Sequence, residues 1–254
     1  MSALPGQNLI VDDTVVSPSR AVVDEASQRL EEVLALGYRQ GEGVPELQQC
    51  LDELAGDPVL VPDHPDIITA RGHLAHWTWQ AGNITEAREL FAALAPDIER
   101  TLGPEHRRTL DVRRRWAACT GRSGTPATAR NLYAQLIPAA ERSLGAEHRD
   151  VVHMRREFAA FTGQAGDRAG ARDLYIDLIP VAERVLGPDH IDTLSARMYL
   201  AACTDAVGDP TGAQDVYAAL LPDMERALGA QHPRTRYVRR VIDDWAANNA
   251  TSRP

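Results

Sequence analysis

Lysine is absent from this sequence, and all 27 of its basic residues are arginine. Without lysine the chain cannot form a Schiff base with a carbonyl substrate, and it cannot supply the phosphate-binding lysine of a P-loop. The motifs G-x-S-x-G, H-E-x-x-H and C-x-x-C and a glycine-rich phosphate loop are also missing. These absences exclude the enzyme classes that such motifs mark. The lysine-free, arginine-rich composition indicates a GC-rich bacterial source.

Long hydrophobic runs are missing as well. No stretch of about 18 apolar residues occurs, so no segment is expected to span a membrane. The start, MSALPGQNLIVDDTVV, has neither the charged region nor the long apolar region of a signal peptide. We therefore expect a cytoplasmic protein with no membrane partner.

The negative charge is unevenly distributed. The formal net charge of −9 arises within residues 1–63, which carry 12 carboxylates and 3 arginines, whereas the remaining residues carry 24 of each. A nucleic-acid-binding protein would show a net basic face. The charge balance therefore argues against a nucleic-acid partner.

A fixed step of 42 residues organises most of the chain. Histidine, glycine, proline and arginine each recur at this step in separate series. The series are His64, His106, His148, His190 and His232; Gly82, Gly124, Gly166 and Gly208; Pro96, Pro138, Pro180 and Pro222; Arg71, Arg113, Arg155, Arg197 and Arg239. Self-similarity at a period of 20–50 residues is typical of stacked repeat proteins.

The pattern of apolar residues in each unit predicts two helices. In residues 190–231, apolar residues first recur at helical spacing from Leu194 to Ala202 and then again from Ala213 to Leu228. Between them Gly208 ends the first helix and Asp209 is a suitable N-cap for the second, as are Asn83, Thr125 and Asp167 in the other units. Leu228-Gly229 ends the second helix.

The unit resembles the long, 42-residue form of the tetratricopeptide repeat found in kinesin light chains and many actinobacterial proteins. The resemblance rests on LGPDHIDTLSARMYLAACTDAVGDPTGAQDVYAALL from Leu186 and LGPEHRRTLDVRRRWAACTGRSGTPATARNLYAQLI from Leu102. It covers about residues 63–247. It implies an all-α fold, a right-handed α-solenoid of helix–turn–helix repeats.

Five segments follow from this register. We expect a flexible tail at 1–18, a divergent helical pair acting as a cap at 19–62, and four repeats at 63–231. A single capping helix at 232–247 and a short tail at 248–254 complete the chain. The capping helix carries Asp243 and Asp244 where the preceding unit has Ala201 and Ala202, which suits a solvated end.

Most of the repeated polar residues have an architectural interpretation. The histidines are predicted to serve helix entry or packing, because stacked equivalent turns do not converge on one site. The arginine series is predicted to pair with Glu99, Glu141, Glu183 and Glu225. The prolines are predicted to produce a regular kink. Cys119 and Cys203, which share a register, and Cys50 are expected to be buried thiols.

Function is better sought where the repeat breaks down. The resemblance implies that the first helix of each unit lines a concave face, and aromatics and arginines gather there although only 5% of the chain is aromatic. The candidate groove residues are His73, His76, Trp79, Arg114, Arg115, Arg122, His153, Arg156, Glu157 and Tyr199. Peptide-binding family members often carry asparagine at the register of His73, Arg115, Glu157 and Tyr199. No asparagine occurs at those positions, which indicates a differently specialised groove.

The favoured hypothesis is a non-enzymatic adaptor or scaffold for protein–protein interaction. Its groove would hold an acidic or carboxylate-bearing segment of a partner, because arginine binds carboxylate in bidentate fashion. The alternative is an enzyme or small-molecule sensor of bacterial secondary metabolism, with His73, His76, His153 and Glu157 as acid–base groups. Self-association is a third hypothesis. Neither a cofactor nor a metal is expected, although His73-x-x-His76 and His153 with Glu157 have ligand spacing.

Overall fold

The computed structural model describes Gln28, residues 44–55 and residues 64–251, and within these it is built of helices. The expected tail at 1–18 and almost all of the first helix of the expected N-terminal pair lie outside the described residues. The first helices of the units are α3 (Pro65–Gln80), α5 (Arg107–Arg122), α7 (Arg149–Gln164), α9 (Ile191–Ala206) and α11 (Pro233–Thr251). The second helices are α4 (Ile84–Leu102), α6 (Pro126–Leu144), α8 (Arg168–Leu186) and α10 (Pro210–Leu228), and α2 (Val44–Ala55) precedes them all.

A histidine of the 42-residue series caps the start of every first helix. Its Nδ1 accepts a hydrogen bond from the backbone N–H two residues later, at 3.4 Å for His64 and 3.2 Å for the other four histidines. This is the work usually done by a Ser, Thr, Asp or Asn side chain at an N-cap. The predicted helix-entry role of the histidines is confirmed.

Glycines and aspartates separate the two helices of a unit. Gly208, like its counterparts in the other units, has a positive φ, here 93°, which most L side chains avoid. Asp167 and Asp209 then cap the next helix, since their Oδ1 atoms accept from the N–H of Gly170 at 2.8 Å and Gly212 at 2.9 Å. Asn83 and Thr125 make no such bond, so the predicted side-chain cap forms in two units of four.

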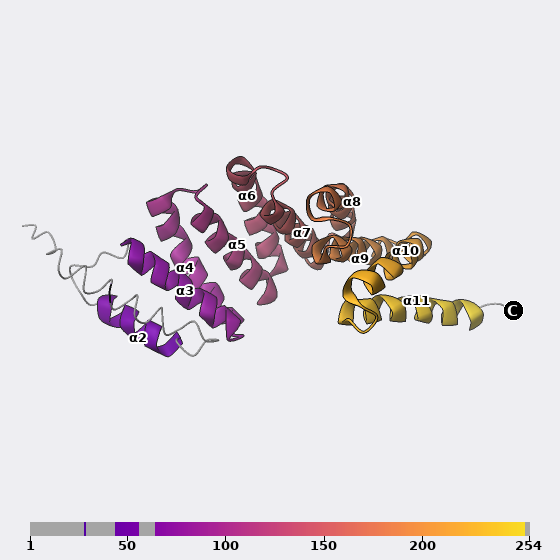
Figure 1. Ribbon diagram of the computed structural model, residues 1–254, viewed down its shortest axis with the longest axis horizontal. Coiled ribbons are helices and arrows are strands. Elements are labelled where there is room, and N and C mark those ends of the chain that lie inside the picture. The colour runs from indigo at the N-terminus through magenta and orange to yellow at the C-terminus, as the bar shows by residue number, and fades with distance from the viewer. Residues whose placement is uncertain (1–27, 29–43, 56–63, 252–254) are drawn as a thin grey trace, which may run out of the picture.

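The array curves towards its first helices. Each helix packs on the next one along the chain, and contacts between alternate helices join α5 to α7 and α7 to α9. Among the described residues no comparable contact joins successive second helices. The first helices therefore lie on the inner, concave side of the superhelix that Figure 1 shows running from α2 to α11.

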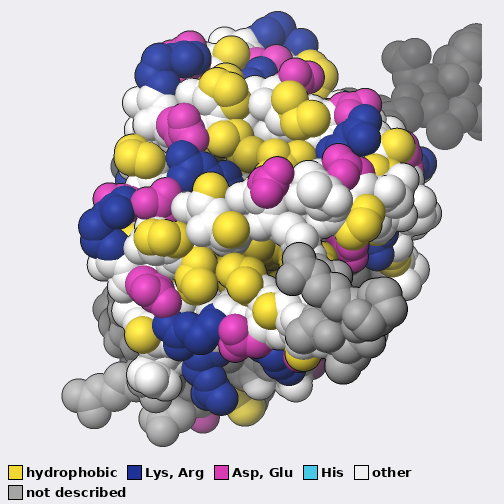
Figure 2. Space-filling view, turned by 90° about the vertical axis from the view of Figure 1, so that its right-hand side faces the viewer, with side chains coloured by type: hydrophobic (Ala, Val, Ile, Leu, Met, Phe, Trp, Pro, Cys, Tyr) yellow, Lys and Arg dark blue, Asp and Glu magenta, His cyan; other side chains and the backbone are white. Residues whose placement is uncertain are grey.

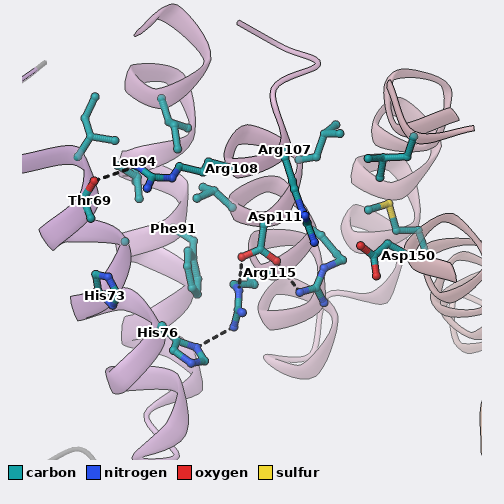
Figure 3. A pocket seen from close by; sticks show the side chains of 18 residues that line it. Thr69, His73, His76, Phe91, Leu94, Arg107, Arg108, Asp111, Arg115 and Asp150 are labelled. Carbon is teal, nitrogen blue, oxygen red and sulfur yellow. Dashed lines mark hydrogen bonds and ion pairs between the residues drawn. The ribbon is translucent and has the colours of Figure 1, made fainter. Parts of the chain in front are cut away.

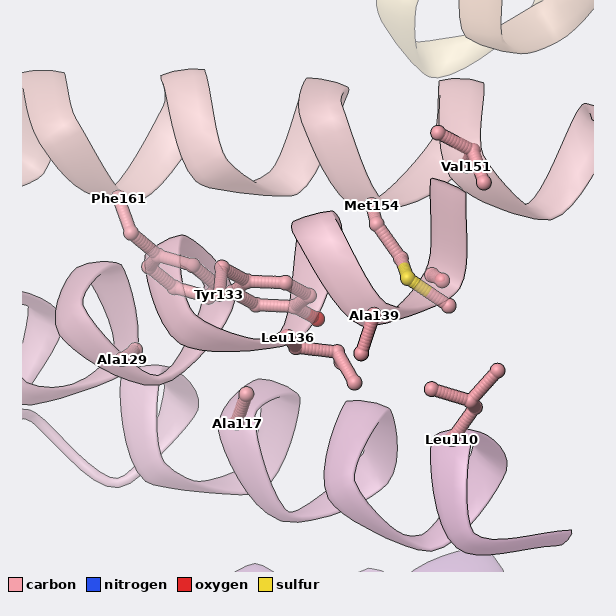
Figure 4. Close-up of a cluster of buried hydrophobic side chains, with 10 residues drawn as sticks. Leu110, Ala117, Ala129, Tyr133, Leu136, Ala139, Val151, Met154 and Phe161 are labelled. Atoms are coloured by element: carbon pink, nitrogen blue, oxygen red, sulfur yellow. The ribbon is translucent and has the colours of Figure 1, made fainter. Parts of the chain in front are cut away.

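The core is a row of hydrophobic clusters, one at each junction between units. In the cluster of Figure 4, Tyr133 stacks on Phe161 at 5.9 Å between ring centroids, and Leu136 and Met154 pack beside them. The small residue Ala201 is fully buried in the last cluster. Cys50, Cys119 and Cys203 are free, buried thiols, as predicted.

The predicted arginine–glutamate pairing is confirmed. Each pair joins the second helix of one unit to the first helix of the next. The pairs are Arg113–Glu99 at 3.6 Å, Arg155–Glu141 at 2.7 Å, Arg197–Glu183 and Arg239–Glu225. Arg71 binds Asp97 at 2.7 Å instead. These partly exposed pairs recur at the same junction between one unit and the next.

The four repeated prolines stand inside α4, α6, α8 and α10, and each of these helices continues through its proline as a single element.

At the C-terminal end of the array, α11 runs on to Thr251, so it is longer than the predicted helix ending at 247. Its Val238 is buried against α10, whereas Asp243 and Asp244 are exposed. Figure 2 faces this end and shows charged side chains scattered among the hydrophobic ones. None of the described helices has the length and hydropathy needed to cross a bilayer.

Candidate functional site

Two adjoining pockets lie on the concave side, where α3, α5 and α7 face one another. The larger has a volume of about 510 Å³ and the smaller about 280 Å³. Both are lined by His76, Arg114 and Arg115, which connect them. All the predicted groove residues except Arg156 and Tyr199 line one pocket or both.

The larger pocket has an apolar floor and a polar rim. Its floor is formed by the buried residues Phe91, Leu94 and Ile98 of α4, which are reached between α3 and α5. Thr69 and His73 from α3 and Arg107, Arg108 and Asp111 from α5 stand around the opening, as Figure 3 shows. A ligand here would meet hydrocarbon at depth and charge at the mouth.

Between the two pockets, Arg115 joins His76 of α3 to Asp111 of α5. Its Nε donates to Asp111 Oδ2 at 2.8 Å, and its Nη1 lies 2.7 Å from His76 Nδ1. Arginine has no acceptor, so Nδ1 of His76 must accept this hydrogen bond and a neutral ring carries its proton on Nε2. Asp111 also receives a hydrogen bond from Arg114 Nη2 at 2.6 Å, so each of its oxygens holds one arginine.

Trp79 forms the aromatic wall of the smaller pocket. The guanidinium carbons of Arg115 and Arg122 lie 5.7 and 5.9 Å from its ring centroid, and the His76 ring lies 5.7 Å away. Such contacts attract the guanidinium groups to the face of the ring. Arg122 is exposed and makes no ion pair with any described residue, which leaves its donors available.

Burial and neighbouring charges lower the pKa of the two histidines. Burial lowers the pKa of His73, and the charge of Arg108 lowers it further. Burial also lowers the pKa of His76, with Arg115 adding to the effect. For Asp111, burial raises the pKa, but Arg114 and Arg115 outweigh burial and hold that pKa below its ordinary value. Five arginines and three carboxylates line the two pockets, so positive charge is in excess.

Arg156 is largely buried and lines neither pocket. Its side chain is 10% exposed, with Nη2 at 2.5 Å from Glu157 Oε1 and Nε at 2.9 Å from Asp192 Oδ1. His153 Nδ1 lies 3.3 Å from the other oxygen of Asp192. Burial raises the pKa of Asp192, but the hydrogen bond with His153 and the charge of Arg156 prevail and bring it to about 2. The network ties α7 to α9.

Tyr199 is half-buried and stacks on Tyr175 at 6.0 Å between ring centroids, away from both pockets.

Four residues that line the larger pocket were not predicted from the sequence: Thr69, Arg107, Arg108 and Asp150. The candidate groove residues were chosen from positions that begin about one turn further along each first helix, so these four residues were not included. The break in the repeat at Arg108, where three other units carry Asp66, Asp150 and Asp192, was the signal that could have found it.

Three of the four acid–base groups of the enzyme hypothesis are held by a polar neighbour, whereas His73 has a ring contact with Trp77. His76 is bonded to Arg115, His153 to Asp192 and Glu157 to Arg156. Among the described residues no group of three or more His, Cys, Asp or Glu side chains is placed to hold a metal ion.

Acidification should weaken the fold through His76. Because its folded pKa lies below the ordinary value near 6.5, the unfolded chain binds protons more readily, and the free energy of unfolding should fall as the pH drops below about 6.5. In His76→Gln, a neutral amide oxygen can still accept from Arg115. Urea unfolding at pH 7.5 and 5.5 should therefore show a smaller pH dependence for His76→Gln than for the natural protein. Equal dependence in both proteins would contradict the assignment.

Comparison with known proteins identifies the repeats. The family model described as tetratricopeptide repeat matches residues 67–115 and 152–192. None of the curated proteins compared with the chain matches it. Among solved structures, a kinesin light chain-like protein of Podosopora anserina with nearly identical TPR-like repeats has a TM-score of 0.63 at 20% identity, covering 82% of this chain and 98% of that one.

Two bacterial structures are also similar. BtubC (BKLC) from P. vanneervenii has a TM-score of 0.61 at 15% identity, covering 83% of this chain and 92% of its own. PlcR of Bacillus thuringiensis, solved in complex with the peptide PapR7 and DNA, has a TM-score of 0.50 at 10% identity, covering 92% and 76%. At these identities the likeness is one of fold. The matched segments are tetratricopeptide repeats, and the chain as a whole has the fold of the kinesin-light-chain-like repeat structures.

Proposed function

We propose that this protein is an adaptor that binds a carboxylate-rich segment of a partner protein in the groove between α3, α5 and α7. The observation that carries the proposal is that Arg114, Arg115 and Arg122 line two connected pockets, with Arg115 and Arg122 over the Trp79 ring. Guanidinium groups bind carboxylates through paired, charge-assisted hydrogen bonds. An aromatic face beside them adds flat apolar contact for the chain that carries those carboxylates.

The protonation states support an anionic partner. Burial lowers the pKa of His73 and of His76 and so favours their neutral forms, which leaves the arginines as the main source of positive charge at the two pockets. Asp111 holds Arg114 and Arg115 in place with one oxygen each. Their remaining N–H donors, together with the exposed Arg122, are the groups offered to a ligand.

The similar structures are consistent with this use of the fold. PlcR was solved in complex with a peptide, PapR7. In tetratricopeptide arrays a concave face lined by first helices presents a long surface to an extended or helical segment. In this chain, that surface bears the arginine cluster.

Arg115→Ala tests the proposal directly. We expect it to weaken binding of a fluorescein-labelled octaglutamate peptide by about 1–3 kcal/mol, the scale of a charge-assisted hydrogen bond, measured by fluorescence anisotropy in 50 mM salt. Binding should weaken further as salt is raised. An octaglutamine peptide should bind neither protein.

The matched control is Arg172→Ala. Arg172 lies on α8, a second helix on the outer side of the array, and its guanidinium contacts the neighbouring Asp173. This variant should bind octaglutamate like the natural protein. If Arg115→Ala also binds as the natural protein does, with its helical circular dichroism intact, the groove is not the binding site and the proposal fails.

A further inference from the structure

The larger pocket exists because one side chain is missing from the register. Gly72 stands on α3 at the position held by Arg114, Arg156 and Met198 in the following units. Arg156 reaches across to Asp192 on the next first helix, and Met198 is buried in the last cluster. At Gly72 no side chain fills the space between α3 and α5, and Gly72 lines the pocket that remains.

Packing does not require glycine at this position. A Cβ built on Gly72 would meet Leu94 Cδ2 at 3.7 Å, which is ordinary van der Waals contact, and the residue lies within α3 at a helical φ. Glycine inside a helix is less stable than alanine by up to about 1 kcal/mol. The fold would therefore gain from a larger residue here, and the one structural consequence of glycine is an open pocket.

A second change makes the floor of the same pocket apolar. Phe91 lies on the floor at the register where the other units carry Tyr133, Tyr175 and Tyr217. In the second unit the hydroxyl of Tyr133 donates to the carbonyl oxygen of Arg114, the residue equivalent to Gly72. Phe91 has no hydroxyl, so the space beside Gly72 is bounded by hydrocarbon from Phe91, Leu94 and Ile98.

The rim of the pocket carries two arginines without an ion-pair partner among the described residues, although Asp111 and Asp150 also line the pocket. Arg108 donates to the hydroxyl of Thr69 at 3.2 Å, and both Arg107 and Arg108 are exposed. Neither makes an ion pair with any residue that the structure describes. Hydrocarbon below and guanidinium above match an apolar side chain that is flanked along its own chain by carboxylates.

We propose that Gly72 opens a specificity pocket between α3 and α5 that takes one apolar side chain of the bound acidic segment. The proposal rests on the proposed function, because the acidic flanks of that segment are held at the groove arginines. It adds a requirement that charge alone does not impose. A partner segment must carry an aliphatic or aromatic residue among its carboxylates.

Two labelled peptides and two variants test this. The peptides are acetyl-Glu-Glu-Glu-Leu-Glu-Glu-Glu-amide and the same peptide with serine in place of leucine. The natural protein should bind the leucine peptide at least tenfold more tightly than the serine peptide, because only leucine gains by leaving water. In Gly72→Met, which introduces the side chain found in the fourth unit, this ratio should fall to near one. Gly72→Ala, which adds only a Cβ, should keep most of the preference.

Thermal unfolding separates loss of the pocket from loss of the fold, and both variants should have a Tm at or above that of the natural protein. If both peptides bind the natural protein equally, the pocket is not used, although the adaptor function stands. If the leucine preference survives in Gly72→Met with the fold intact, leucine binds elsewhere and the inference is wrong. If neither peptide binds the natural protein, the proposed function fails together with the inference.

Discussion

Replacement of Glu157 by alanine should lower the free energy of unfolding by about 2–4 kcal/mol, although the side chain that is removed is charged rather than apolar. The reason is Arg156, which is 10% exposed and stays charged at any pH the protein meets. Removing one partner from a buried ion pair leaves an uncompensated charge, and this loss exceeds the net value of the pair. Asp192 remains within 2.9 Å, which keeps the loss from being larger.

Urea unfolding at pH 7 measures this effect, and Glu147→Ala is its matched control. Glu147 pairs with Arg184 at 2.5 Å, as close as Glu157 to Arg156, but both side chains are more than half exposed. Exposed pairs contribute little because water and salt screen them. We expect no measurable change for Glu147→Ala. Equal effects of the two substitutions would mean that Arg156 reaches water and that no buried charge network ties α7 to α9.

The architecture was readable from the sequence because its determinants recur. A histidine at the entry of each first helix and a glycine between the two helices act within a few residues of the chain. The Arg155–Glu141 pair spans fourteen positions, but it repeats with the 42-residue register and could be inferred from that alone. Periodicity converts such interactions, which lie between units, into a pattern that is visible along the chain.

The site was readable only in part, because its geometry depends on contacts that do not repeat. The family register identified the concave face, and with it His76 and Arg115, which the structure brings to 2.7 Å. It could not show that Arg156 is buried, since this follows from Asp192 on the next first helix. Nor could it reveal the larger pocket, whose floor belongs to α4 and is reached through the space above Gly72. The burial of Arg156 and the depth of the pocket both depend on how far apart the helices lie, and the sequence does not specify these distances directly.

Gly121→Ala should lower the free energy of unfolding by about 1–3 kcal/mol, against the usual rule that alanine stabilises a helix. Gly121 lies near the end of α5, and a Cβ there would stand 2.7 Å from Cδ1 of Phe161 and closer still to the far edge of the ring. Phe161 is buried and stacks on Tyr133, so its ring can move aside only by disturbing the cluster shown in Figure 4. Overpacking of this kind forces strain into neighbouring side chains.

Gly72→Ala is the control that separates this steric effect from helix propensity. Both substitutions add one methyl group to a glycine in a first helix, but the Cβ at residue 72 meets Leu94 only at 3.7 Å. Gly72→Ala should therefore raise the free energy of unfolding by up to about 1 kcal/mol, and the two variants should differ in sign when unfolded in urea under the same conditions. Stabilisation by both would show that Phe161 does not lie over Gly121. The stacking of the third unit on the second would then have to differ from the one described.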